Sequence, residues 1–283
     1  MVMVNSYRFL ARAGIALLLL GVGTVVAVQA SNIHLPRAHA THLVAAHPAG
    51  WRLRQVQLVR AAQGGTTGTL RVLIVGASVS HGLGASAPSH DYASDLARMV
   101  QRQTGRAVEL TVWSHAGARI AAGDRWSLPV GQQVVIVQLI TNDFSGATPL
   151  LVYQHELSVL IDRVRDTSPR ASLLCLGAWE PAYAVNRVGI PVLAYDAIER
   201  RSCAAHGGHF LSPSPIFQHA AWRGPAGRST AFGRGDDFHP NNQGHLHLAE
   251  AILAQLEQQH ALPTPTPPSH PTTLTKNSSV RGR

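Results

Sequence analysis

The sequence contains a single lysine, Lys276, although lysine and arginine together number 24. This lysine lies in a proline- and threonine-rich stretch and follows no glycine-rich turn. P-loop nucleotide hydrolysis and lysine-dependent reduction both place a lysine beside the reacting group. The scarcity of lysine therefore excludes both kinds of chemistry.

Cysteine is almost as scarce, since the chain has only Cys175 and Cys203. Two cysteines do not make the spaced ligand set of a zinc site, so we predict no metal site. Cys175 lies in the apolar run LLCLGA, where it could serve either as a small buried apolar side chain or as one half of a disulfide. Pairing of the two cysteines therefore stays open at this point.

Acidic residues are also few, 15 in all, which leaves a formal net charge of +9. The basic residues are spread along the chain, and no basic–aromatic motif of a nucleic-acid-binding module is present. We expect no nucleic-acid partner and attribute the charge to a cationic surface that tolerates anionic polymers of a cell envelope.

The amino-terminal residues 1–30 form a segment of their own. Arg8 and Arg12 precede an uncharged apolar run over residues 13–28, and no acidic residue comes before it. This pattern is typical of a cleaved signal peptide, with membrane attachment through residues 13–30 as the alternative. Both interpretations predict an exported protein that is periplasmic, in the cell envelope or secreted.

Two further segments flank the region expected to fold. Residues 31–69 read as a linker with a short helix over residues 51–62, and residues 261–283 as a disordered, proline- and threonine-rich tail. Between them, residues 70–260 alternate apolar runs with stretches of helical spacing. The expected strands cover residues 70–75, 108–113, 133–140, 172–177 and 209–211. The expected helices cover residues 92–104, 153–164, 191–205 and 243–259. This alternation predicts an α/β protein, a three-layer α/β/α sandwich whose central, mainly parallel sheet has about five strands.

The candidate chemistry lies in two short stretches far apart in the sequence. Ser78 follows the first expected strand, between Gly76 and Gly82, which allow a sharp turn and a close approach of backbone to ligand. Asp236 lies three residues before His239 in the stretch DDFHP. A serine, a histidine and a carboxylate are the nucleophile, general base and base-orienting group of serine acyl transfer.

These stretches resemble the conserved blocks of the SGNH (GDSL-type) hydrolase family. Gly76-Ala77-Ser78 with Gly82 is similar to its first block, in which the family usually has aspartate at the place of Ala77. Asp236 and His239 match its terminal Asp-x-x-His block, and the following HPNNQGHLHLAEAI is similar to its last loop and helix.

Two intermediate blocks follow in the same order along the chain. Gly117 falls after the second expected strand, where the family has a glycine that joins its oxyanion hole. Thr141-Asn142-Asp143 is similar to the family's Gly-x-Asn-Asp block, with Ile140 at the usual place of the glycine. The resemblance covers residues 70–259.

The resemblance implies a serine esterase with a Ser78–His239–Asp236 triad. The oxyanion hole would consist of the backbone N–H groups of Ser78 and Gly117 and the side-chain amide of Asn142. No metal or organic cofactor is implied. The implied substrates are small acyl esters or O-acetylated glycans, with pocket walls from residues 144–149 and 179–188.

Several neighbouring residues have a simpler interpretation. Asp143 is expected to be structural, and Asp237 is the competing carboxylate, although its spacing to His239 is less favourable. The chain is rich in histidine, with 16 in total, so a single histidine is weak evidence. We assign no catalytic role to His81, His115, His245 and His247.

Three alternatives to an esterase share parts of this sequence pattern. A dinucleotide-binding loop is excluded by the long spacing from Gly76 to Gly82 and by the lack of an acidic residue after the second expected strand. An exported binding protein without turnover stays open, because Ala77 and Ile140 depart from the family pattern. An O-acyltransferase also stays open, because it would share the acyl-enzyme and differ only in the acceptor.

Overall fold

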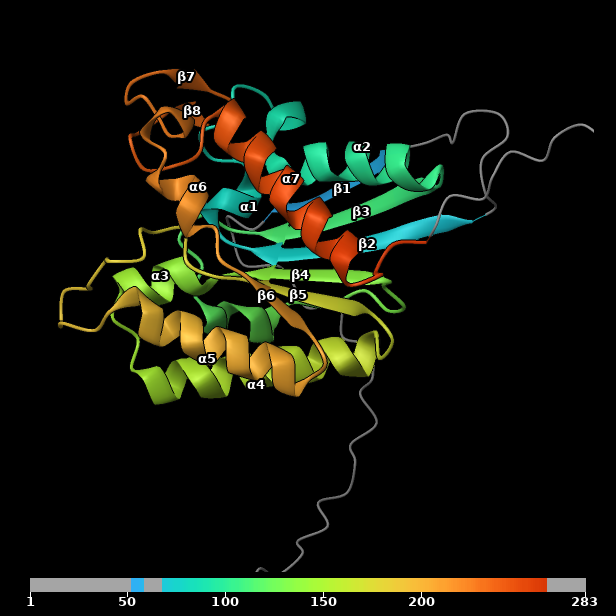
Figure 1. The fold of residues 1–283 in the computed structure, drawn as a ribbon, viewed down its shortest axis with the longest axis horizontal. Helices are drawn as coiled ribbons and strands as arrows, with labels where there is room; N and C mark the ends of the chain where they lie inside the picture. Colours follow the sequence, from blue (N-terminus) through green and yellow to red (C-terminus); the bar gives the residue numbers. More distant parts are fainter. Residues whose placement is uncertain (1–51, 59–67, 264–283) are drawn as a thin grey trace, which may run out of the picture. The chain divides into compact units, whose positions relative to one another are not determined.

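The computed structural model describes residues 52–58 and 68–263, which fold within one compact unit. A six-stranded sheet forms its centre (Figure 1). Its strands are β1 (Arg52–Leu58), β2 (Thr69–Gly76), β3 (Ala107–Ser114), β4 (Val134–Gln138), β5 (Ser172–Leu176) and β6 (His209–Leu211).

The strands are ordered β1-β3-β2-β4-β5-β6, and only β1 runs antiparallel to its neighbour. The five parallel strands, counted along the chain, therefore have the order 2-1-3-4-5 of flavodoxin-like sheets. This confirms the predicted sheet. Between β2 and β4 the chain turns from building one half of the sheet to building the other, and ligands bind at such a point in open α/β sheets.

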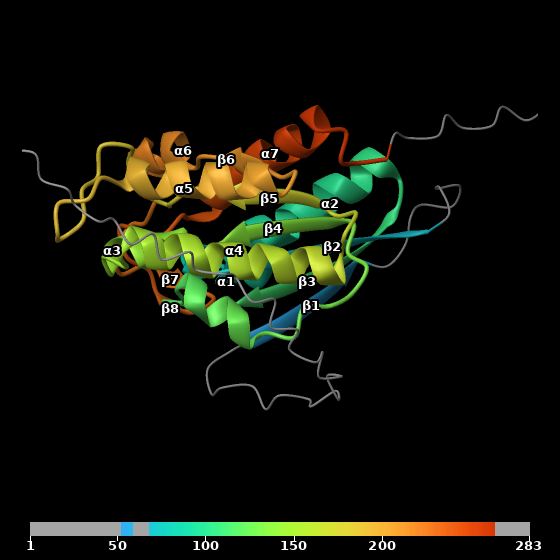
Figure 2. The same cartoon turned by 90° about the horizontal axis from the view of Figure 1, so that it is seen from below.

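Helices cover both faces of the sheet (Figures 1 and 2). One face carries α2 (Tyr92–Thr104) and α7 (Asn242–Gln258), which pack against each other. The other carries α4 (Leu150–Thr167) and α5 (Val192–Ala205), with the short 3-10 helix η2 (Ile120–Arg125) beside α4. These layers confirm the predicted α/β/α arrangement.

The alternation of side chains along the strands explains why both faces need a helical cover. On β4, Val135 and Val137 belong to the core under α4 and α5, while Val134 and Ile136 belong to the core under α2 and α7. Successive side chains of a strand face opposite sides, so a continuous apolar run buries both faces. The uninterrupted apolar strands in the sequence thus dictate the three layers.

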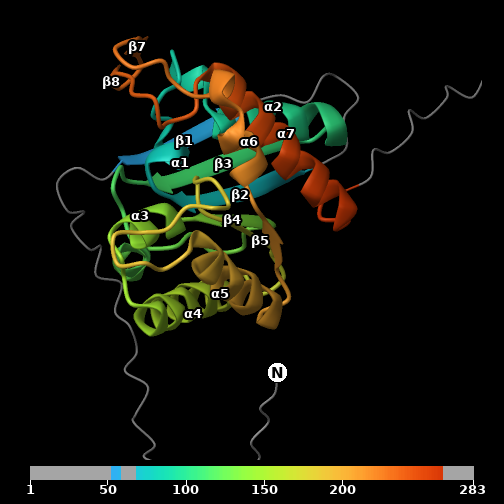
Figure 3. The same cartoon turned by 60° about the vertical axis from the view of Figure 1, so that its left-hand side comes forward.

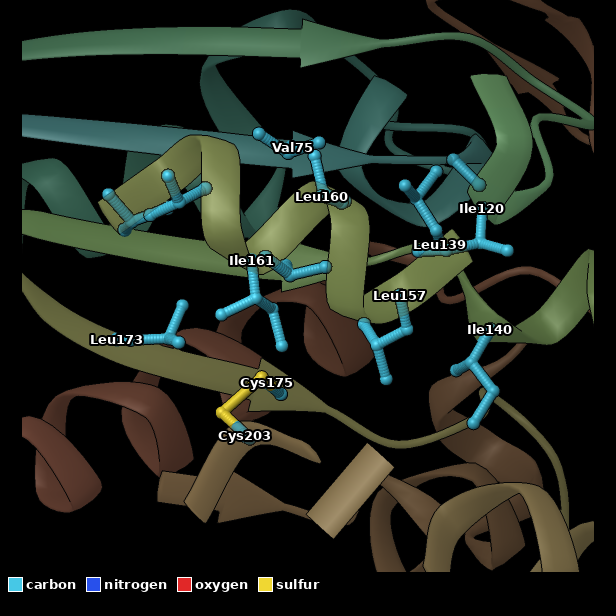
Figure 4. Packing of buried hydrophobic residues seen from close by; sticks show 14 of the residues in the cluster. Val75, Ile120, Leu139, Ile140, Leu157, Leu160, Ile161, Leu173, Cys175 and Cys203 are labelled. Atoms are coloured by element: carbon cyan, nitrogen blue, oxygen red, sulfur yellow. A yellow bond between two sulfur atoms is a disulfide. The ribbon is translucent and has the colours of Figure 1, made fainter. Parts of the chain in front are cut away.

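Cys175 of β5 and Cys203 of α5 form a disulfide, which the sequence had left open (Figure 4). Both cysteines are fully buried in the core under α4 and α5. The bond ties the fourth parallel strand to the helix that covers it.

Two sequence-based expectations need correction. Within residues 51–62 we expected a short helix, but the chain forms β1, which pairs with β3 from Arg52 opposite Ser114 to Leu58 opposite Val108. The strand expected over residues 133–140 is shorter: β4 ends at Gln138, and Ile140 already begins α3 (Ile140–Ser145). The apolar residues that follow Gln138 belong to the turn and helix that carry Asn142.

Several expectations fall on residues that the structure does not describe. These include the apolar segment at residues 13–28, most of the predicted linker and the tail from residue 264 onward. Among residues 52–58 and 68–263, no helix is both long and apolar enough to cross a membrane.

Candidate active site

The candidate residues follow neighbouring strands at one edge of the sheet. Ser78 comes two residues after β2, Gly117 three residues after β3 and Asn142 four residues after β4. Because these three strands are adjacent and parallel, their carboxyl ends meet at the same edge. The order of the strands in the sheet therefore places the three loops beside one another.

Ser78 opens the one-turn helix α1 (Ser78–His81) and is almost completely buried. The turn before it depends on Gly76, since a Cβ there would lie 1.9 Å from the Ser80 hydroxyl oxygen. Ser80 in turn donates to the Gln138 side chain over 2.9 Å and lies 2.7 Å from the Tyr92 hydroxyl oxygen. This buried polar network fixes the turn that carries Ser78 against the end of β4.

Asn142 connects the two loops expected to form the oxyanion hole. Its side-chain Nδ2 donates to the carbonyl oxygen of Ala118 over 2.9 Å, which holds Asn142 beside the loop of Gly117. An amide nitrogen has two hydrogens, so one remains for another acceptor. Gly117 has a backbone φ of +81°, which residues with a side chain rarely adopt. A Cβ at this position would meet no other atom within 4 Å, so the backbone conformation, and not lack of space, favours glycine here.

Asp236 and His239 form the catalytic-type carboxylate–imidazole pair expected from their spacing. His239 Nδ1 lies 2.8 Å from Asp236 Oδ2. Asp236 Oδ1 also accepts the backbone N–H groups of Phe238 and His239, over 3.0 and 2.8 Å. Burial alone would raise the pKa of Asp236, but the hydrogen bonds from His239 and Phe238 outweigh it and lower that pKa. Asp236 therefore favours the ionised form, which accepts the Nδ1–H and leaves Nε2 as the basic nitrogen.

The competing carboxylate has a different partner, since Asp237 Oδ1 accepts the backbone N–H of Ala226 over 2.8 Å. The histidines to which no role was assigned also have structural contacts. His245, for example, is fully buried and joins the Tyr92 backbone N–H to the Leu83 carbonyl. His81 lies 3.2 Å from the Ser114 hydroxyl oxygen and packs on the Phe232 ring.

The loop after Ser78 packs directly on the loop of His239. At Gly84, whose φ is +88°, a Cβ would lie 2.2 Å from the Pro240 carbonyl oxygen and 3.2 Å from the His239 Cβ. The segment after Ser78 and the segment that carries His239, which are far apart in the sequence, are thus in van der Waals contact at this edge. The structure shows no hydrogen bond between the Ser78 hydroxyl and the His239 imidazole, so the triad itself stays a prediction.

Asp143, expected to be structural, is buried behind the candidate site. Its carboxylate accepts the backbone N–H of Ile120 over 2.7 Å and the Thr148 hydroxyl over 2.9 Å, which ties α3 to the start of η2 and to the loop that follows α3. Burial raises the pKa of Asp143 to about 6, although both hydrogen bonds and the charge of Arg119 act in the opposite direction. Asp143 therefore shapes the segment that carries Asn142.

Trp179 and Glu180 are neighbours of the site whose importance the sequence did not indicate individually. The Trp179 backbone N–H donates to the Thr141 hydroxyl over 2.9 Å, and its ring Nε1 donates to the Phe238 carbonyl over 2.9 Å. Trp179 thus joins the segment of Asn142 to the segment of His239. Burial raises the pKa of Glu180 to about 7, with Arg223 lowering it. The only sequence signal was the position of Trp-Glu directly after the fourth expected strand.

No group of three or more histidine, cysteine, aspartate or glutamate residues in the described ranges is arranged to hold a metal ion. A depression of about 770 Å³ lies at the opposite edge of the sheet, where its lining includes Thr69 and Ser172 at the start of β2 and β5 and Gln133 just before β4. It is remote from the candidate residues along every strand, so it does not belong to this site.

Similar structures support the fold. One is a carbohydrate esterase family 2 enzyme with a carbohydrate-binding domain from Corynascus thermopiles (Myceliophthora fergusii), at 15% identity and a TM-score of 0.50, covering 72% of this chain and 68% of that one. A two-domain esterase active on acetylated mannans matches at 18% identity and a TM-score of 0.50, and the match covers 74% of this chain and 54% of that one. A salicylyl-acyltransferase from a tetracycline biosynthetic pathway matches at 17% identity and a TM-score of 0.53, and the match covers 70% of this chain and 57% of that one. The present chain thus spans little more than half the length of the last two.

No curated protein sequence gives a significant match to this chain. The model of the GDSL-like lipase/acylhydrolase family matches residues 74–246, which contain all five candidate residues. This stretch is more than half of the sequence and includes the end of β2, the strands β3 to β6, the helices α2, α4 and α5, and the loops at the reactive edge. The chain therefore belongs to the GDSL-like lipase/acylhydrolase family and is a hydrolase that acts on esters.

Proposed function

We propose that this chain is an exported serine esterase that cleaves carboxylic esters through an acyl-enzyme on Ser78. The observation that carries the proposal is the Asp236–His239 pair, joined through Nδ1 over 2.8 Å on a loop that packs against the turn after Ser78. Such a pair fixes the imidazole so that Nε2 can remove a proton from a hydroxyl.

The proposed reaction has two steps. In the first, Ser78 Oγ bonds to the ester carbonyl carbon while His239 Nε2 takes its proton, and the same proton then goes to the departing alcohol. In the second, water gives a proton to Nε2 and attacks the acyl-enzyme, and Ser78 takes the proton back as the carboxylic acid leaves. Asp236 stays ionised throughout and stabilises the charged imidazole.

The negative charge on the carbonyl oxygen needs hydrogen-bond donors. We assign this role to the backbone N–H groups of Ser78 and Gly117 and to the Asn142 amide. The hydrogen bond from Asn142 to Ala118 supports this role, because it orients the amide before substrate arrives. Preorganised donors of this kind lower the barrier because they need not reorient as charge develops.

Small acyl esters and O-acetylated glycans are the proposed substrates. A carbohydrate esterase and an esterase active on acetylated mannans share the fold, and this favours acylated glycans. The walls that would select the acyl group and the alcohol come from residues 144–149 and 179–188, which hydrogen-bond to each other through Asn186 and Phe144. Transfer of the acyl group to another hydroxyl would use the same residues, and the assay below distinguishes it.

Export is part of the proposal. The buried Cys175–Cys203 disulfide supports it, because disulfides persist in oxidising compartments. The basic and apolar pattern of residues 1–30 is the second reason.

The test is hydrolysis of a series of esters by the full chain, from acetyl to long acyl groups and including acetylated polysaccharide. We expect Ser78→Ala and His239→Ala to lose at least a thousandfold in kcat. The matched control is His247→Ala, because His247 Nδ1 also pairs with an acidic residue three positions away, over 2.8 Å to Glu250. Equal activity of Ser78→Ala and the unaltered chain would reject the mechanism. Preferential transfer to an added sugar hydroxyl would identify an acyltransferase.

A further inference from the structure

Large apolar side chains are exposed at the reactive edge of the molecule. Apart from Val130, those exposed in the described residues lie at the start of α4, in the loop between β5 and α5, and at the start of α5. They are Leu151, Val152, Tyr183, Val185, Val188 and Leu193, here called the rim patch. Leu151 and Tyr183 are 81% and 80% exposed, so these side chains make little contact with the rest of the fold.

Hydrogen bonds hold the segments of the rim patch together. The Asn186 side chain donates to the Phe144 carbonyl, and that of Arg187 to the Gly146 carbonyl, both over 3.2 Å. The Tyr195 hydroxyl donates to the Thr148 carbonyl. The β5–α5 loop therefore lies against the connection from α3 to α4, close to Asn142. Figures 1 and 2 show this loop, in yellow, projecting beyond the end of the sheet where α3 lies. In Figure 3 the same loop again lies beside α3.

The loop presents its apolar side chains from a hydrogen-bonded frame. Residues 184–192 form a hairpin, closed by hydrogen bonds from Asn186 N–H to the Ile190 carbonyl and from Val192 N–H to the Ala184 carbonyl. The buried Asn186 Oδ1 accepts the backbone N–H groups of Val188 and Ile190. Ala184 and Ile190 pack on the core, whereas Val188 is exposed. The hairpin therefore sets the exposure of Val185 and Val188.

Arg187 is the charged residue of the β5–α5 hairpin and lies between the exposed valines of the rim patch. The carboxylates nearest to the patch in sequence are Glu156, one helical turn after Val152, and Glu180, before the loop. Arg119 lies beside Arg187, because a Cβ at Gly146 would fall 2.1 Å from the Arg119 guanidinium nitrogen. An apolar surface that carries exposed arginines complements an anionic lipid surface.

We propose that the rim patch docks on an anionic phospholipid bilayer, with its apolar side chains entering the interface and Arg187 and Arg119 facing lipid phosphates. The exposed Tyr183 suits this position, since its ring has an apolar body and a polar end. Docking would bring the reactive edge of the sheet to the lipid surface. It goes beyond the proposed function, because binding requires no hydrolysis and no attachment through residues 13–30.

The test places a fluorescent probe on the patch and follows its surroundings. In the full chain carrying Ser78→Ala, so that no lipid is cleaved, Val188→Cys is labelled with an environment-sensitive fluorophore. The native cysteines are paired with each other and buried, so they do not compete for the label. Val130→Cys is the matched control, as a 74% exposed valine outside the patch. Phosphatidylglycerol vesicles should shift the emission at position 188 to shorter wavelength and leave that at position 130 unchanged. Arg187→Gln should raise the lipid concentration at half-saturation about fivefold.

The local readout separates this docking from any attachment elsewhere on the chain. A probe at position 188 that stays in water while the protein co-sediments with vesicles would overturn the proposal. Equal responses at positions 188 and 130 would overturn it as well. A shift that appears at higher protein concentration without vesicles would show that the patch binds a second copy of the chain instead. Equal binding to phosphatidylcholine, unaffected by Arg187→Gln, would refute the role of charge.

Discussion

The buried carboxyl group of Asp143 should make the stability of the fold depend on pH. In the folded chain its pKa rises from the ordinary 3.8 to about 6, mainly because burial disfavours the charged form. Between these values the folded state holds a proton that the unfolded state has released. The free energy of unfolding therefore falls as pH rises from about 4 to about 6 and changes no further above that range. A shift of this size corresponds to about 3 kcal/mol.

Asp143→Asn isolates this contribution. An amide keeps the oxygen that accepts the Ile120 N–H, and its nitrogen can donate to the Thr148 hydroxyl, which accepts as well as donates. Other groups with raised pKa whose shift does not involve Asp143, such as Asp196, titrate alike in both proteins. The stability of the variant relative to the unaltered chain should therefore increase by about 3 kcal/mol between pH 4 and pH 7.

The measurement is urea unfolding of both proteins at several pH values, with the free energy of unfolding extrapolated to water. Asp237→Asn serves as the control, because it removes an exposed carboxylate that also accepts one backbone hydrogen bond. A stability difference between Asp143→Asn and the unaltered chain that stays constant from pH 4 to pH 7 would refute the reasoning. Charges that face Asp143 from neighbouring elements are those of Arg119, Glu156 and Glu199, so the experiment is best done at constant ionic strength.

Three further predictions test the site and the fold. Asn142→Ala should lower kcat by about a hundredfold or more with little change in KM. The control Ser145→Ala, on the same helix, should leave kcat unchanged. An equal loss of kcat in the two variants would contradict the oxyanion role of Asn142. Gly84→Ala should lower both activity and the melting temperature, because its Cβ would collide with the Pro240 carbonyl. Gly189→Ala, with a similar φ of +84° and open space, should show only the smaller cost of backbone strain, and the comparison fails if both variants behave alike. Replacing Cys175 and Cys203 by alanine should lower the free energy of unfolding by about 3–4 kcal/mol for a separation of 28 residues, measured in denaturant; unchanged stability would show that packing alone holds α5 on β5.

The sequence predicts the parallel sheet well because burial on both faces demands uninterrupted apolar strands. Strand β1 was missed for a physical reason. Its apolar residues Leu53 and Val56 are three positions apart, as on a helix, and its conformation is decided by the free edge of β3, more than fifty residues away. Pairing with a distant edge leaves no local signal.

The candidate site likewise has features that the sequence could predict and features that it could not. Glycines and reactive side chains after each strand could be recognised, because a parallel sheet brings those loops to one edge. The link through Trp179 to Thr141 and Phe238 could not, since it depends on how three distant segments meet. The disulfide was undecidable for a related reason: Cys175 would be buried with or without a partner, and only the position of α5 over β5 brings Cys203 within bonding distance.

The two departures from the family pattern were the main argument for a protein that keeps the fold without turnover. Ala77 is 1% exposed and Ile140 is fully buried, and both belong to the apolar core under α4 and α5. Figure 4 shows Ile140 in this core. The residues proposed to contact substrate lie instead on the loops at the carboxyl edge, and their hydrogen bonds involve Ala118, Asp236 and His239. The departures therefore alter the packing beneath the site and remove no proposed donor, base or nucleophile. Loss of activity in this chain would have to come from the position of Ser78 relative to His239, and the ester assay measures its consequence.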